Sequence, residues 1–135
     1  MAVTPGASDF VISQGDSLPI MRIPIPANSA NELLDLAGCT VTFLGRKHGT
    51  NTYPPPIIRL IESYAQETED GEDVIAVYVH LTDDDTKAIS VANGQTYTEM
   101  EGELEIVDGN GDVLTVPSLS YIEWYIRDDI GDGAA

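Results

Sequence analysis

The sequence has little basic charge, a single cysteine and no long apolar run. Six Lys and Arg side chains stand against 23 Asp and Glu side chains in 135 residues, so the formal net charge is −17 at pH 7. A field of this sign repels nucleic acid phosphates and anionic lipid headgroups, and we expect neither nucleic acid nor a membrane as partner. Cys39 has no second cysteine to pair with, so the fold does not depend on a disulfide.

Residues that commonly carry catalysis are also scarce. The only imidazoles are those of His48 and His80, and the sequence contains no Gly-x-Ser-x-Gly, His-x-x-x-His or Cys-x-x-Cys pattern. Alternation places Cys39 on the apolar face of its strand, where a thiol is normally inert. We therefore predict a protein that is not an enzyme, with no catalytic residues, no cofactor and no metal.

One turn imitates a calcium loop. Residues 108–112, Asp-Gly-Asn-Gly-Asp, place oxygen ligands at alternate positions, as the opening of such a loop does. The sixth and twelfth positions would need Gly and a bidentate Glu, but Val113 and Leu119 stand there. We interpret the segment as a hairpin turn and keep a weak surface cation site as the alternative.

What the chain does contain is a series of short alternating runs separated by turn residues, which is typical of an all-β domain. We predict an immunoglobulin-like antiparallel β-sandwich of about seven or eight strands over residues 9–130, with flexible arms at 1–8 and 131–135.

Pro19 and Pro24 place strand 18–25 at a sheet edge, because neither residue has an N–H to donate. One helical turn is expected at 83–89, and the loop at 46–56 is expected at one end of the domain, where partners commonly bind. The other expected strands are residues 10–13, 39–44, 57–65, 74–81, 96–107 and a last one after Pro117.

The cleanest alternation runs over residues 96–107 and places four carboxylates on one strand face. Like charges on one strand cost stability, and six basic residues are too few to neutralise them internally. A merely solvated face is the commonest explanation of such a row, and the shortage of internal cations adds contact with a basic partner as a candidate role. Tyrosines expected to point outward extend the candidate interface, because tyrosine is enriched where proteins meet. The candidate interface residues are Glu99, Glu101, Glu103, Glu105, Tyr78, Tyr97, Tyr121 and Tyr125.

Several segments follow one another in an order seen in a family of phage proteins. They are residues 9–17 (DFVISQGDS), 34–43 (LDLAGCTVTF), 81–86 (LTDDDT), 97–105 (YTEMEGELE), and Asp108-Gly109 followed by residues 115–117 (TVP). Together they resemble the N-terminal Ig-like domain of phage baseplate upper proteins and similar small Ig-like proteins of tailed-phage virions. The resemblance extends over nearly the whole expected domain.

This resemblance implies a non-enzymatic structural protein of a tailed-phage virion, made in the bacterial host cytoplasm. It would act as an assembly adaptor in the baseplate, tail or neck, or as a base for fibres. Its partners would be other virion structural proteins, bound within a homo-oligomer or symmetric ring where many weak contacts add up. A capsid decoration or head-fibre protein on the shell exterior is the alternative, and a carbohydrate-binding module with clustered aromatics is a third.

Overall fold

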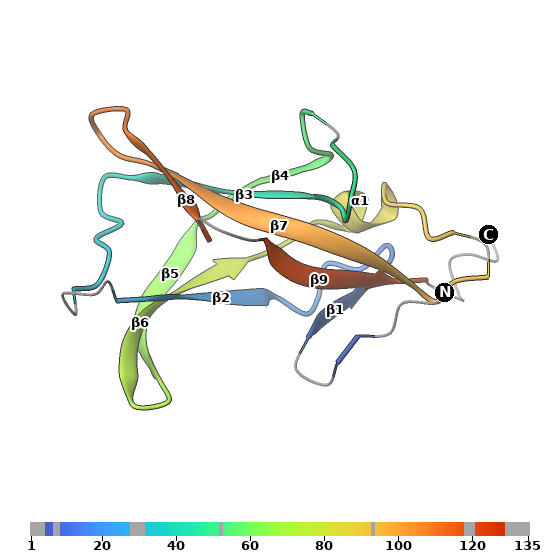
Figure 1. Cartoon of the computed structure of the whole chain (residues 1–135), viewed down its shortest axis with the longest axis horizontal. Helices are drawn as coiled ribbons and strands as arrows, with labels where there is room; N and C mark the ends of the chain where they lie inside the picture. The colour runs from blue at the N-terminus through green and yellow to red at the C-terminus, as the bar shows by residue number, and fades with distance from the viewer. Residues whose placement is uncertain are drawn as a thin grey trace.

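Two β-sheets pack on one shared hydrophobic core in the computed structural model of the chain (Figure 1). The structure describes residues 5–6, 9–27, 32–51, 53–92, 94–117 and 121–128. Within them the elements are β1 (Phe10–Ser13), β2 (Met21–Pro26), β3 (Thr40–Lys47), β4 (Ile57–Leu60), β5 (Ser63–Glu69), β6 (Glu72–Val79), α1 (Asp83–Lys87), β7 (Tyr97–Val107), β8 (Val113–Val116) and β9 (Ile122–Arg127).

The larger sheet has six strands and the smaller sheet three. The larger follows the order β1-β9-β7-β3-β4, with β8 paired to β7 beside this path, and the smaller follows β2-β6-β5. Strand pairs are antiparallel except β1 with β9, which run parallel. The prediction of an all-β fold is therefore confirmed, and the described residues form nine strands where seven or eight were expected.

The proline-containing strand lies at a sheet edge and residues 108–112 form a turn between two strands, as the sequence predicted. β2 pairs only with β6 and forms an edge of the smaller sheet, although it begins at Met21 and not at residue 18. Asp70 and Gly71, both with positive φ, join β5 to β6, and residues 108–112 join β7 to β8. Across the described ranges, no helix is long and apolar enough to cross a membrane.

The single strand predicted over residues 57–65 is wrong, because the chain changes sheets inside it. β4 pairs with β3 in the larger sheet, whereas β5 pairs with β6 in the smaller one. At the crossing, buried Ile61 donates its N–H to the carbonyl oxygen of Val41 at 2.8 Å. Alternation alone does not show which sheet a residue belongs to, so the break was invisible in the sequence.

Two glycines let the central aromatic rings lie against the larger sheet. Gly45 and Gly102 are directly opposite each other on β3 and β7. The fully buried rings of Phe43 and Trp124 meet edge to face above them, with centroids 5.9 Å apart. A Cβ atom at Gly102 would lie 2.6 Å from Cζ of Phe43, so only glycine fits this position.

We expect Gly102→Ala to lower the free energy of unfolding by about 2–3 kcal/mol, because the added methyl overpacks the core. Urea unfolding followed by Trp124 fluorescence measures this change. The matched control is Gly109→Ala in the β7–β8 turn, where an added Cβ meets nothing within 4 Å. It should change stability by less than about 0.5 kcal/mol, and equal losses in both variants would contradict the packing argument.

The short helix α1 is fixed at its start by a capping box. Asp85 donates its N–H to Oγ1 of Thr82 at 3.1 Å, and Oδ2 of Asp85 accepts the N–H of Thr82 at 3.0 Å. The same Oδ2 lies 2.8 Å from Nε of Arg59 on β4. Buried Thr86 donates its hydroxyl to the carbonyl oxygen of Asp16, which ties the helix to the β1–β2 connection. The helical turn predicted at 83–89 is confirmed, and its N-cap is Thr82.

We expect Asp85→Ala to lower the free energy of unfolding by about 2 kcal/mol, since it removes the Asp85 half of the capping box and the partner of Arg59. Asp83→Ala serves as the control, because Asp83 is exposed in the same helical turn and takes no part in the capping box. The control should stay within about 0.5 kcal/mol of the parent in chemical unfolding. A loss in the control as large as that of Asp85→Ala would show that the pairing is not the cause.

Candidate functional site

The four strand carboxylates do lie on one face of β7, and the pairing register sets their neighbours. Glu99 is opposite Tyr125, and Glu101 stands between Arg46 and Glu123. Leu44 is opposite Glu103, and Thr42 is opposite Glu105. Directly opposed residues point to the same side of a sheet, so these side chains form a grid on the outer face of the larger sheet.

Glu101 is not a solvated carboxylate, because it is buried and paired. Its side chain is 5% exposed, and Oε2 lies 3.2 Å from Nη2 of Arg46. Oε1 accepts the N–H of Gly49 at 2.7 Å and lies 3.4 Å from Nδ1 of His48. The expectation that the acidic row lacks internal partners is therefore wrong for Glu101, which organises the end of β3 and the loop after it.

The environment of Glu99 disfavours the charged form of its carboxyl. Burial raises the pKa of its carboxyl above the ordinary value of 4.5, while the nearby His48 lowers this pKa and the acids Glu123 and Glu101 raise it further. Nδ1 of His48 lies 3.5 Å from Oε2 of Glu99. At neutral pH the ionised Glu99 therefore costs stability, since a raised pKa means that the folded state favours the protonated form.

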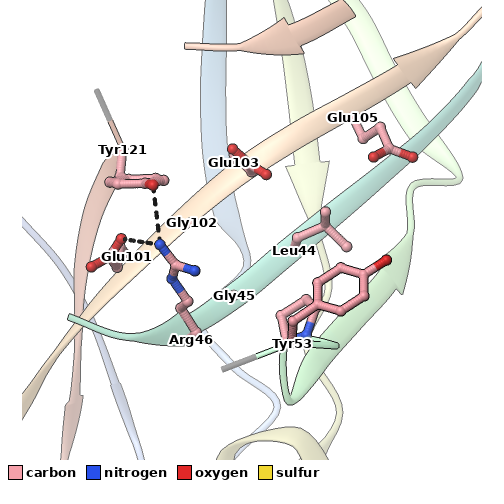
Figure 2. A pocket seen from close by; sticks show the side chains of 10 residues that line it. Leu44, Gly45, Arg46, Tyr53, Glu101, Gly102, Glu103, Glu105 and Tyr121 are labelled. Carbon is pink, nitrogen blue, oxygen red and sulfur yellow. Dashed lines mark hydrogen bonds and ion pairs between the residues drawn. The ribbon is translucent and has the colours of Figure 1, made fainter. Parts of the chain in front are cut away.

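Glu103 and Glu105 form the open part of the row. Neither carboxylate has an ion pair or a hydrogen bond with a residue that the structure describes. Both line a hollow of about 180 Å³ on the outer face, which Figure 2 shows beside Leu44 and the ring of Tyr53. The described residues that line it are Leu44, Gly45, Arg46, Tyr53, Pro55, Glu101, Gly102, Glu103, Glu105 and Tyr121.

Of the four candidate tyrosines, Tyr121 belongs most clearly to this site. Its hydroxyl oxygen accepts a hydrogen bond from Nη2 of Arg46 at 3.0 Å, and its ring centroid lies 5.2 Å from the guanidinium carbon of Arg46 (Figure 2). This contact holds the Arg46 head between Glu101 and the Tyr121 ring. Half-exposed Tyr121 thus forms one wall of the hollow.

The other three tyrosines differ from expectation or lie apart. Tyr125 is 5% exposed, so its ring does not offer the free surface expected of it, and burial followed by the charge of Glu123 raises its pKa. Tyr97 is half-buried at the start of β7, opposite Arg127. Tyr78 lies on β6 of the smaller sheet, where its hydroxyl donates to Glu67, so it is not part of the acidic row.

Sequence reasoning missed the residues that complete this site, namely Leu44, Arg46, Tyr53 and Pro55. The sequence predicts a loop at Arg46, but β3 continues to Lys47. The signal that could have identified Arg46 is its position two residues beyond Leu44, which continues the alternation of the strand. Tyr53 gave no such signal, because only the fold of the loop brings it beside the carboxylates.

The other candidate chemical groups are separate from this hollow. Cys39 is half-buried, packs against the core, and its thiol points to the carbonyl oxygen of Asp35 with an Sγ–O distance of 3.7 Å. His80 is exposed near Tyr78 and Arg59 beside the smaller sheet. In the 108–112 turn, Oδ1 of Asp108 accepts the N–H groups of Asn110 and Asp112. No group of three or more His, Cys, Asp and Glu among the described residues is arranged to hold a metal ion.

Comparison with models of protein families gives no match to this chain. A search of curated proteins finds no relative.

We expect opposite effects from neutralising two neighbouring carboxylates. Glu101→Gln should lower the free energy of unfolding by about 1–3 kcal/mol at pH 7, because it weakens the buried contacts to Arg46 and Gly49. Glu99→Gln should raise it, because the variant removes a partly buried charge that faces other acids. The gain should disappear as the pH falls through the raised pKa of Glu99 towards 4.5, where the parent carboxyl becomes protonated.

Urea unfolding of the parent and both variants at several pH values measures these differences. The two variants are matched controls for each other, since each removes one negative charge from the same strand face. A loss of stability in Glu99→Gln at neutral pH would contradict the assignment of an unfavourable charge at this position.

Proposed function

We propose that the chain is a non-enzymatic, Ig-like structural domain of a tailed-phage virion that acts as an assembly adaptor in the baseplate, tail or neck. It binds a basic surface of another virion protein through the outer face of its larger sheet. The observation that carries the proposal is the pair of open carboxylates, Glu103 and Glu105, on the central strand β7. The order of the phage-like segments in the sequence adds the virion context.

The strand order supports the Ig-like part of the proposal. In immunoglobulin domains strands B, E and D belong to one sheet, and strands C, F and G to the other, which variable-type domains extend by C′. Here β2-β6-β5 corresponds to B-E-D, and β9-β7-β3-β4 corresponds to G-F-C-C′. Under this correspondence β8 is an addition to the F–G hairpin, and the acidic row lies on strand F.

The chemistry of the hollow suits the binding of a cation. The described residues that line it include no Ser, Cys or His, so they offer no Ser–His or Cys–His pair. Its cation, Arg46, is already bound by Glu101 and Tyr121. Glu103 and Glu105 remain available, and carboxylates on a strand are suited to bind Arg or Lys side chains of a partner.

We expect the protein to occur in the assembled virion in a small ring of about three to twelve copies on the tail axis or baseplate. Cryo-EM of the particle measures both the location and the copy number. Hundreds of copies over the shell would support the alternative, a capsid decoration protein. Absence from the particle would overturn the virion assignment altogether.

We expect Glu103→Gln combined with Glu105→Gln to reduce incorporation into virions about tenfold or more, because the open carboxylates are lost. Quantitative mass spectrometry of purified particles measures this. The control is Glu72→Gln with Asp73→Asn, which removes two charges from exposed positions at the start of β6. An equal reduction in the control would mean that net charge, and not this face, decides assembly.

A further inference from the structure

Strand β4 has its polar pattern reversed. Its charged residue, Arg59, is opposite the core residue Phe43, whereas Ile58 and Leu60 point outward and are 49% and 59% exposed. Antiparallel sheets normally turn their polar residues to solvent. Arg59 lies on the same face of β4 as buried Ile57, and its side chain, 39% exposed, forms an ion pair with Asp85. The two aliphatic side chains on the other face are left uncovered.

These aliphatic side chains adjoin the open carboxylates. Leu44 on β3 stands between Ile58 on β4 and Glu103 on β7, and Thr42 stands between Leu60 and Glu105. The outer surface therefore changes from apolar to acidic over two strand spacings, roughly 10 Å. We call the five residues Leu44, Ile58, Leu60, Glu103 and Glu105 the acidic–apolar face.

A partner is more suited to lie on this face than to extend the sheet at the edge of β4. An inward-pointing charge such as Arg59 is one of the features that protect an edge strand from pairing with another chain. The face itself has no such protection. Tyr53, which is 91% exposed, stands beside it and can cover a bound side chain.

The charges of the chain decide what kind of partner fits. A second copy would bring a net charge of −17 against Glu103 and Glu105, and three of the six basic residues already have internal carboxylate partners. Those three are Arg22, Arg46 and Arg59. The complementary surface therefore has to come from a different, basic protein, with apolar side chains next to its cations.

We propose that the acidic–apolar face docks an amphipathic basic segment of another protein. Apolar side chains of that segment cover Ile58 and Leu60, and an Arg or Lys side chain enters the hollow between Glu103 and Glu105. This inference rests on the proposed function in that both assign partner binding to the larger sheet. It adds the apolar half of the surface and the chemistry of the occupant.

The test uses a fluorescein-labelled peptide amide of about twelve residues that repeats Leu-Leu-Arg-Arg, with Ser-Ser-Arg-Arg as the charge-only comparator. Fluorescence anisotropy measures the affinity of the full chain for each. We expect the double variant Glu103→Gln, Glu105→Gln to weaken both peptides about tenfold. The double variant Ile58→Thr, Leu60→Thr should weaken only the leucine peptide, also about tenfold, because threonine keeps the strand but removes the apolar contact.

Matched controls separate this face from general attraction to an acidic protein. Glu72→Gln with Asp73→Asn removes the same charge elsewhere, and Val113→Thr with Leu114→Thr removes exposed aliphatic side chains on β8. Both controls should bind within about twofold of the parent. Amide NMR shifts should concentrate on β3, β4 and β7.

Equal losses in the controls, shifts elsewhere, or a parent that binds neither peptide at about 1 mM would overturn the proposed docking face. These results would leave the virion assignment standing. Conversely, absence of the protein from virions would overturn the proposed function and would not change the peptide measurement.

Discussion

The close approach of β3 and β7 at the Gly45–Gly102 pair is the constraint on which the rest of the structure depends. With no Cβ on either residue, the Phe43 ring lies directly against the sheet and meets the Trp124 ring from β9. Phe10 of β1 extends the cluster, with its ring centroid 6.3 Å from that of Trp124. Four neighbouring strands of the larger sheet are thereby joined through one aromatic cluster, whose Phe10 ring is partly buried.

The same glycine pair fixes what lies on the opposite face. When Gly45 is opposite Gly102, Arg46 is necessarily opposite Glu101 and Leu44 is opposite Glu103. A slip of one residue would turn Arg46 and Leu44 towards the core and would place Phe43 outside. The same strand register therefore determines both the core packing and the charges on the outer face. The ion pair of Glu101 with Arg46 and the open position of Glu103 are therefore consequences of how the aromatic core packs.

The sequence pattern was informative wherever a strand has one buried face and one exposed face. β7 shows this best, since Met100, Leu104 and Ile106 are buried as the alternation of residues 96–107 predicts. The pattern failed where contacts with distant parts of the chain determine whether a side chain is buried. Glu101 and Tyr125 are on the predicted outer face, yet neighbouring side chains bury both. The local sequence does not show that Arg46 lies opposite Glu101 or that Glu99 lies opposite Tyr125. The sheet change at Ile61 was hidden for the same reason.

The inward turn of Arg59 belongs to this class of long-range effects as well. In the sequence, residues 57–60 are three aliphatics and one arginine, and no local rule places the arginine on the core side. The pairing of β4 with β3 does so, since it places Arg59 opposite Phe43, and Asp85 in the capping box of α1 gives the charge of Arg59 a partner. The exposed Ile58 and Leu60 therefore depend on the strand register, as the chemistry of the outer face does.

The two kinds of carboxylate on β7 have different physical roles. Glu101 already has a cation and an N–H donor, so a partner would gain little by binding it. Glu103 and Glu105 are two residues apart on one strand face, roughly 7 Å along the strand, and repel each other within a Debye length of about 8 Å. A bound cation would relieve this repulsion as well as form new contacts. The electrostatic part of the affinity should therefore weaken with salt, while burial of Ile58 and Leu60 would contribute a part that salt does not screen.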